Sequence, residues 1–212
     1  MQRELRIDAF VELICPWCLI GKRHLARALE YFAQTDPQVR VRVHWHAVQL
    51  VPQVPAEGWP FGEFYLRRLG SPEAVRQRQA QVQAAAAQAG VDIDLARIAR
   101  FPNTSRAHRL LELAALQPHT VDPLLERLFA AYFRRGEDLG DTGTLVAIAQ
   151  ETGLDPAAAR ACLDAAPPAA EPAPVSGVPL FVFDGQWSLS GAQPPEALWS
   201  AMRRCVEQAA TA

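Results

Sequence analysis

Two cysteines separated by two residues, Cys15-Pro16-Trp17-Cys18, are the residues of this chain best suited to covalent chemistry, and they directly follow an apolar run over residues 10–14. Thiol-disulfide exchange needs a thiolate nucleophile and a second thiol close enough to resolve the mixed disulfide. A cysteine at the start of a helix meets the first need, because unpaired backbone amides and the helix dipole favour negative charge there. The spacing predicts that Cys15 attacks and that Cys18, about one helical turn further on, resolves.

Two other interpretations of this pair stay open at this point. Closely spaced cysteines can be small buried apolar residues, and Cys-x-x-Cys is also half of many zinc sites. The other half of a zinc site is not evident, because Cys162 and Cys205 are far apart in the sequence. His44 and His46 fall on an expected strand. The strand-to-helix context favours a redox dithiol, and we expect no bound metal.

The composition is that of an ordinary globular protein, with half of the 212 residues apolar and a formal net charge of -2 at pH 7. Such a charge gives no electrostatic basis for binding nucleic acid or an anionic membrane. The first eight residues mix both signs of charge, where a secretory signal needs an apolar core. No apolar run approaches the roughly 20 residues that span a bilayer. We therefore expect a cytoplasmic protein with neither nucleic acid nor membrane as partner.

The elements around the dithiol predict a strand, a helix and a second strand. Residues 5–13 are mostly apolar and indicate a buried strand, and residues 16–32 indicate a helix with proline in its first turn. Residues 39–46 alternate between apolar and polar side chains, which is typical of a strand with one buried face. A right-handed crossover would make the two strands parallel.

The middle of the chain predicts helices and contains no strand signal. A loop rich in proline and glycine starts at Gln49 and precedes them. The helices are expected to run from Ser71 to Ala89, from Asn103 or Thr104 to Leu116, from Thr120 or Asp122 to Arg134, from Asp141 or Thr142 to Thr152, and onward from Asp155-Pro156.

The last part of the chain returns to strands after a linker. Residues 165–176 are rich in alanine and proline and are the best linker candidate. Residues 178–183 and 186–189 flank Asp184-Gly185, and this pattern predicts a β-hairpin. A helix from Pro194 or Pro195 to about Gln208 is expected to follow.

Several motifs occur in this order of elements. They are Cys15-Pro16-Trp17-Cys18 with Ile20-Gly21, Pro102-Asn103-Thr104 with Ala107-His108-Arg109-Leu110, Ala130-Ala131-Tyr132-Phe133, Gly177-Val178-Pro179 and Gly191-Ala192-Gln193. With them the chain resembles the DsbA-like members of the thioredoxin superfamily, and more closely their FrnE-like branch. The resemblance implies an α/β protein, a thioredoxin-like fold with an inserted all-helical domain. Residues 1–49 and 172–212 would form the thioredoxin-like domain, and residues 50–171 the insertion over the active site.

The resemblance also implies substrate-binding residues. It implies a cis peptide before Pro179, which leaves the backbone of Val178 beside Cys15 to pair with an extended substrate; the alternative is an ordinary strand-edge proline. It places Asn103 and His108 near the active site. The alternative for these two is a helix-capping asparagine and a buried histidine with satisfied hydrogen bonds.

Other residues near the dithiol leave alternatives open. Pro16 and Trp17 are expected to form an apolar surface for substrate, unless Trp17 packs beneath the insertion. Glu12 stands where family members commonly have aspartate, and is either a proton relay or a strand-end residue that faces solvent. Cys162 and Cys205 are expected to be small buried apolar residues outside the mechanism.

We predict a thiol-disulfide oxidoreductase or isomerase that acts through Cys15 and Cys18 on protein or small-molecule disulfides. It needs no metal or organic cofactor, although glutathione is a candidate co-substrate. No histidine between the cysteines stabilises the thiolate, so we expect a moderately oxidising couple that reduces or isomerises at least as readily as it oxidises. One alternative is a glutathione-dependent isomerase or transferase of the kappa or 2-hydroxychromene-2-carboxylate isomerase type. A second is a non-catalytic module that binds clients.

Overall fold

The computed structural model describes residues 3–165 and 175–209. The chain forms two compact units, of which the first comprises Met1–Val48, Ala89–Val91 and Pro174–Ala212, and the second Gln49–Gln88 and Asp92–Ala173. The sequence placed one domain boundary between residues 49 and 50, beside the observed division, but did not indicate that residues 89–91 belong to the first unit. The other expected boundary, between residues 171 and 172, and most of the expected linker lie outside the described residues.

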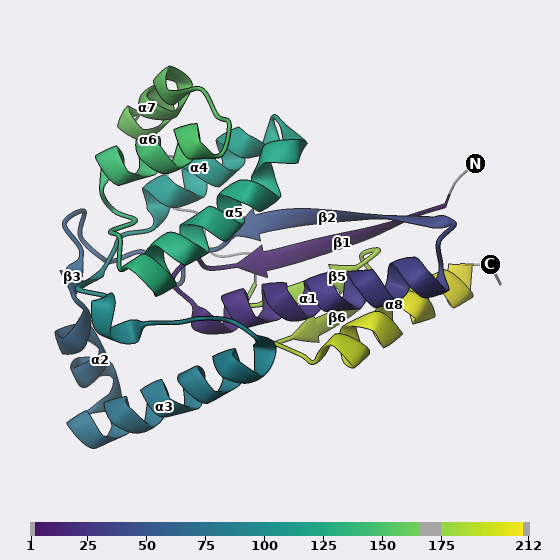
Figure 1. The fold of residues 1–212 in the computed structure, drawn as a ribbon, viewed down its shortest axis with the longest axis horizontal. Helices are drawn as coiled ribbons and strands as arrows, with labels where there is room; N and C mark the ends of the chain where they lie inside the picture. Colours follow the sequence, from purple (N-terminus) through teal and green to yellow (C-terminus); the bar gives the residue numbers. More distant parts are fainter. Residues whose placement is uncertain (1–2, 166–174, 210–212) are drawn as a thin grey trace. The chain divides into compact units, whose positions relative to one another are not determined.

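The first unit is built on a four-stranded sheet with the order β2-β1-β5-β6. β1 (Arg3–Val11) pairs in parallel with β2 (Val39–Ala47) and antiparallel with β5 (Leu180–Phe183). β6 (Trp187–Ser190) completes the hairpin with β5. Helices α1 (Pro16–Thr35) and α8 (Pro195–Ala209) run side by side along this sheet (Figure 1). The expected strand-helix-strand and strand-strand-helix segments are both present.

One face of this sheet and the two helices enclose the core of the first unit. Leu5, Ile7 and Ala9 alternate along β1 with more exposed residues, so the period of two places all three on the same buried face. They pack against residues of α1, α8 and β5, including Phe32, Phe181, Phe183, Leu198 and Met202. Each such side chain contributes about 1.5–3 kcal/mol when it is removed from water. This packing fixes α1, and with it the dithiol, on the sheet.

The hairpin turn confirms the prediction made from Asp184-Gly185. Both residues adopt a positive φ, 47° and 68°, which aspartate tolerates and glycine adopts freely. The carboxylate of Asp184 accepts a hydrogen bond of 2.7 Å from the backbone amide of Arg6. The backbone amide of Asp184 donates one of 2.9 Å to the carbonyl of Arg6. The turn is therefore joined to β1 as well as to its own two strands.

The second unit is mostly helical. Its helices are α2 (Phe61–Leu69), α3 (Pro72–Ala89, whose last residue belongs to the first unit), α4 (Ser105–Ala115), α5 (Val121–Ala130), α6 (Thr142–Glu151) and α7 (Pro156–Asp164), with 3-10 turns η1 (Leu95–Arg97) and η2 (Pro118–Thr120) and a π-helical turn η3 (Ala131–Arg135). Several predicted caps are confirmed, because Ser71, Asp141 and Asp155 accept hydrogen bonds from amides of the first turn. Within the described residues no helix is long and apolar enough to cross a membrane.

Two features of the second unit were not predicted. Residues 61–69 form α2 just after the proline-rich loop, and β3 (Trp59–Pro60) pairs with β4 (Arg100–Phe101) in a short two-stranded sheet. Trp59 and Phe101 are opposite each other in this pair, and the ring of Phe64 from α2 stacks on Phe101 at 3.7 Å between centroids. Contacts between segments about forty residues apart thus determine these elements, and no local pattern encodes them.

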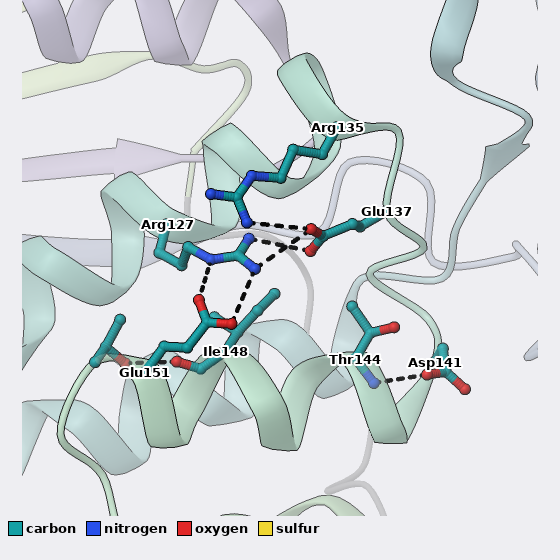
Figure 2. A network of polar contacts seen from close by, with 8 residues as sticks. Arg127, Arg135, Glu137, Asp141, Thr144, Ile148 and Glu151 are labelled. Atoms are coloured by element: carbon teal, nitrogen blue, oxygen red, sulfur yellow. Dashed lines mark hydrogen bonds and ion pairs between the residues drawn. The ribbon is translucent and has the colours of Figure 1, made fainter.

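A network of charged side chains joins the helices of the second unit (Figure 2). Arg127 of α5 donates to Glu137 at 3.0 Å and to Glu151 of α6 at 2.6 Å. Arg135 lies 3.5 Å from Oε1 of Glu137, an oxygen that Arg127 also contacts. The guanidinium of Arg127 is nearly covered, so these bonds are less screened by water than ordinary surface ion pairs.

Candidate active site

The dithiol lies where β1 gives way to α1. β1 ends at Val11, two residues earlier than expected, and residues 12–14 continue as a buried loop. Cys15 is the N-cap residue of α1, with the extended backbone typical of that position. Its amide donates to the carbonyl of Glu12 at 3.1 Å, and its own carbonyl accepts from the amide of Cys18 at 3.0 Å. The helix therefore starts at Pro16, as predicted.

The two sulfur atoms have opposite environments. Cys15 is partly exposed, whereas Cys18 is buried. The pKa of Cys15 is lowered, chiefly because the Cys18 thiol donates a hydrogen bond to its sulfur. The backbone amides of Cys18 and Trp17 lower the pKa of Cys15 further, although neither makes a hydrogen bond of ordinary capping geometry with its sulfur. Burial and the negative charge of Glu12 act in the opposite direction and raise this pKa. The reachable cysteine is therefore the one that favours the thiolate.

Cys18 has the properties of a resolving thiol. Burial raises its pKa well above the ordinary value, and the nearby charges of Cys15 and Glu12 add to the rise. The amide of Glu12 donates a hydrogen bond of 3.4 Å to its sulfur, which favours the thiolate in part. Cys18 thus stays protonated and donates to Cys15 until Cys15 has been consumed in a mixed disulfide.

Glu12 does not face solvent. Its side chain is 1 % exposed, so the interpretation as a solvent-facing strand-end residue is wrong. One carboxylate oxygen accepts a hydrogen bond of 2.7 Å from the amide of Leu13. The carboxylate is therefore buried within the same loop as the dithiol, in a place where it acts on the charge of both sulfur atoms.

Pro179 packs directly on the helix that bears the dithiol. The peptide bond between Val178 and Pro179 is cis, as the resemblance implied. A Cβ placed on Gly21 of α1 would lie 3.1 Å from the Cγ atom of Pro179, which shows how closely the ring approaches the helix. The carbonyl of Pro179 accepts a hydrogen bond of 2.8 Å from the amide of Gly191.

Val178 lies at the end of the sheet where the dithiol loop begins. In the β1–β5 pair Phe10 is opposite Leu180, so Val178 lies just before the end of β5 that is paired with the last part of β1. Val178 is only partly buried. Among the described residues it makes no backbone hydrogen bond, so its amide and carbonyl are free to pair with another chain. Pro16 and Trp17 are also only partly buried, beside the more exposed cysteine.

Asn103 and His108 belong to the second unit. The side-chain nitrogen of Asn103 donates to the carbonyl of Val54 at 2.5 Å. Its side-chain oxygen accepts from the side chain of Gln49 and from the backbone amide of Ser105, both at 3.0 Å. These bonds give Asn103 a structural role at the start of α4. His108 is buried in the same helix.

The other two cysteines differ from each other. Cys205 is buried in the core of the first unit, as expected, and burial raises its pKa. Cys162 is only partly buried, so the expectation that it is a buried residue is wrong, and its thiol donates to the carbonyl of Arg109 at 3.6 Å. In the described part of the chain, no three histidine, cysteine, aspartate or glutamate side chains are grouped as a metal site would require.

The sequence did not identify three residues next to this site as important. Gly21 and Gly191, which contact Pro179 from two sides, appeared only as members of motifs. His24 had no partner that the sequence could name, and its Nδ1 lies 2.9 Å from the carbonyl oxygen of Gln193. The sequence signal that could have identified Gly21 is the presence of a glycine inside an expected helix. Glycine is unfavourable there unless close packing requires it.

The sheet has this strand order, its first helix carries a Cys-x-x-Cys pair at the N-terminus, and a cis proline packs against that helix. Together these features define a protein of the thioredoxin fold. The chain belongs to the family of the DSBA-like thioredoxin domain, whose model matches residues 6–203. Members of this family are thiol oxidoreductases.

Solved structures are similar to the chain over nearly its whole length. The probable DsbA oxidoreductase SCO1869 from Streptomyces coelicolor is 27% identical, with a TM-score of 0.81, covering 94% of this chain and 89% of its own. A 2-hydroxychromene-2-carboxylate isomerase is 14% identical, with a TM-score of 0.62 and coverage of 97% and 98%. The cytosolic disulfide reductase DsbM from Pseudomonas aeruginosa, solved with GSH, is 17% identical, with a TM-score of 0.59 and coverage of 95% and 99%. The last two show the fold alone.

Proposed function

We propose that this protein is a thiol-disulfide oxidoreductase that reduces or isomerises disulfides through Cys15 and Cys18. The observation that supports this most directly is the geometry of the pair, with a partly exposed Cys15 at the N-cap of α1 and a buried Cys18 within its first turn. In agreement with it, the pKa of Cys15 is lowered and that of Cys18 is raised. An exchange enzyme needs this asymmetry, because the attacking thiol must be ionised while the resolving thiol must stay protonated until the mixed disulfide has formed.

The reaction proceeds in two displacements. The thiolate of Cys15 attacks one sulfur of the substrate disulfide, which breaks the S–S bond, forms a mixed disulfide with Cys15 and releases one substrate thiolate. Cys18 then loses its proton and attacks the sulfur of Cys15, which releases the second substrate thiolate and leaves a Cys15–Cys18 disulfide. The substrate gains two electrons and the dithiol loses two, and both released thiolates take up protons. A dithiol donor or glutathione must then reduce the enzyme again.

Glu12 is a candidate for the group that takes the proton from Cys18. It is the buried carboxylate nearest in sequence, and its amide already contacts the Cys18 sulfur. A proton acceptor must lie within reach of the reacting thiol, and a carboxylate in the same loop as the dithiol meets this need.

Val178, Trp17 and Pro16 would bind the substrate. Among the described residues the amide and carbonyl of Val178 have no backbone partner, so they can pair with an extended segment, as in strand addition at a sheet edge. Trp17 and Pro16 offer an apolar surface between the two cysteines. Asn103 and His108 stay predictions as substrate-binding residues, and the hydrogen bonds of Asn103 favour a structural role.

The proposal includes neither a metal nor an organic cofactor, and it keeps the cytoplasm as the expected compartment. The disulfide reductase among the structural relatives is described as cytosolic and was solved with GSH, which makes reduction with glutathione as co-substrate the direction we propose. The isomerase shares the fold at 14% identity, and two cysteines at the site support exchange over glutathione-dependent isomerisation.

Insulin reduction by the wild type, Cys15→Ser and Cys18→Ala tests this proposal, with Cys162→Ala as the control for loss of a cysteine outside the site. We expect both site variants to lose turnover, Cys162→Ala to keep it, and Cys18→Ala to accumulate a mixed disulfide at Cys15. Glutathione conjugation that survives in Cys15→Ser without reductase activity would instead favour the isomerase or transferase. Undiminished client binding in Cys15→Ala/Cys18→Ala, with no reductase activity in the wild type, would favour the binding module.

A further inference from the structure

Gly21 lies on the buried face of α1, three residues after Cys18 and four before Leu25. A glycine inside a helix lowers stability by about 1 kcal/mol relative to alanine, so its presence here needs a compensating contact. A Cβ at this position would lie 3.1 Å from Cγ of Pro179 and 3.2 Å from Cζ of Phe181, closer than ordinary van der Waals contact. The lack of a side chain at residue 21 is what allows Pro179 to pack against the helix.

Pro179 is also connected to α1 by a second route. Its carbonyl accepts the amide of Gly191, in the turn between β6 and α8. In the same turn the carbonyl of Gln193 lies 2.9 Å from Nδ1 of His24. Because a carbonyl oxygen only accepts, Nδ1 of His24 bears the proton and donates it. His24 lies three residues after Gly21, on the same side of α1.

We propose that Gly21 and His24 are positioning residues for substrate binding, which set where Pro179, and with it the backbone of Val178, lies beside the dithiol. Gly21 sets the distance between the proline ring and α1. His24 fixes the turn whose Gly191 amide is bonded to Pro179. The inference rests on the proposed disulfide exchange and deepens it by assigning residues that act without touching the reacting sulfur atoms.

The geometry separates two properties of the site. The groups that lower the pKa of Cys15 are the thiol of Cys18 and the first amides of α1, and they belong to the helix of the dithiol and not to the segment around Pro179. Binding of an extended disulfide substrate depends on the position of Val178. A methyl group at residue 21 forces its neighbours to move by a few tenths of an ångström, and Pro179 and the fully buried Phe181 must share that movement.

Gly21→Ala tests the first contact, with Gly62→Ala as the matched control, because Gly62 is also helical and a Cβ there meets nothing within 4 Å. For a peptide disulfide we expect KM to rise about three- to tenfold in Gly21→Ala, since a displacement of about 1 Å can cost a factor of a hundred. The rate and pH midpoint of Cys15 alkylation by iodoacetamide stay at the wild-type values. Gly62→Ala changes neither quantity.

His24→Ala and His24→Asn test the second contact, and serve alone if Gly21→Ala does not fold. The side-chain amide of asparagine can donate in place of Nδ1, so we expect KM to rise in His24→Ala and to return toward the wild type in His24→Asn. A wild-type KM in both Gly21→Ala and His24→Ala, or no recovery in His24→Asn, overturns the positioning role and leaves the proposed function intact. A wild type inactive on every disulfide refutes the function itself, and with it this inference.

Discussion

The backbone amide of Glu12 donates a hydrogen bond of 3.4 Å to the sulfur of Cys18. The carbonyl of the same residue accepts the amide of Cys15 at 3.1 Å. One residue after the end of β1 therefore contacts both cysteines through its backbone, while its buried carboxylate lies in the same loop. The dithiol is positioned by the loop before it as well as by the helix that follows.

Glu12→Gln should separate the electrostatic effect of this carboxylate from proton transfer. Its charge raises the pKa of both thiols, so its removal is expected to shift the midpoint of Cys15 alkylation to lower pH. If Glu12 also relays a proton, resolution of the mixed disulfide by Cys18 slows by about a hundredfold or more. Stopped-flow measurement of both steps distinguishes the effects.

Glu4→Gln is the matched control for Glu12→Gln, because Glu4 lies on β1 with an exposed carboxylate paired to Arg42. It should change neither the alkylation midpoint nor the resolution rate. An unchanged midpoint in Glu12→Gln would contradict the electrostatic role, and an unchanged resolution rate would contradict the relay.

The stability of the reduced protein should have a maximum as pH is varied near the ordinary cysteine pKa of about 8.5. The pKa of Cys15 is lowered on folding, so its contribution is complete above the unfolded-state pKa and is lost as pH falls through the folded-state pKa. The pKa of Cys18 is raised, so its contribution is complete below the unfolded-state pKa and is lost as pH rises through the folded-state pKa. Urea denaturation between about pH 5 and 10 measures both limbs.

Cys15→Ser provides the control for this pH dependence. It removes the titrating group responsible for the rising limb, so the variant should show only the fall at high pH. A rising limb of unchanged size in Cys15→Ser would assign it to another group.

Asp141 is expected to stabilise the second unit by capping α6. Its carboxylate accepts the amide of Thr144 at 2.6 Å, and this hydrogen bond is the main reason why the pKa of Asp141 is lowered (Figure 2). Asp141→Ala should lower the free energy of unfolding by about 1 kcal/mol at pH 7. Because the pKa is lowered on folding, the charge-dependent part is present above about pH 4 and is lost as pH falls through the folded-state pKa.

Asp141→Asn keeps an acceptor for the Thr144 amide and removes the charge. It should be more stable than Asp141→Ala at pH 7, and its stability should lose the acid dependence assigned to Asp141. Equal urea midpoints for Asp141→Ala and the wild type would show that the cap does not contribute.

Arg127 of α5 is expected to stabilise the second unit through its two carboxylate partners, Glu151 on α6 and Glu137 in the segment before α6. Arg127→Met leaves Glu137 and Glu151 without this cation and should lower the free energy of unfolding by about 1–3 kcal/mol. Arg127→Lys keeps the charge but cannot donate to both carboxylates in the same planar geometry, so it should recover only part of the loss. Urea denaturation at low and high salt measures the free energy of unfolding of each variant. If Arg127→Lys were as stable as the wild type, only the charge of Arg127 would matter.

The sequence alone determined the local features of this protein. The dithiol at a strand-helix junction, the caps at Ser71, Asp141 and Asp155, and the Asp184-Gly185 turn all follow from short-range hydrogen bonds and backbone preferences. Such preferences are properties of a few neighbouring residues, so a single chain is enough to recognise them.

Only the tertiary structure decided the features that depend on distant segments. The burial of Glu12, the hydrogen bonds that Asn103 accepts from Gln49 and donates to Val54, and the β3–β4 pair have no local signature. The same holds for Pro179, which lies against Gly21 although almost 160 residues separate them in the chain. These contacts arise from close packing and from the pairing of buried polar groups, both of which require the whole folded unit.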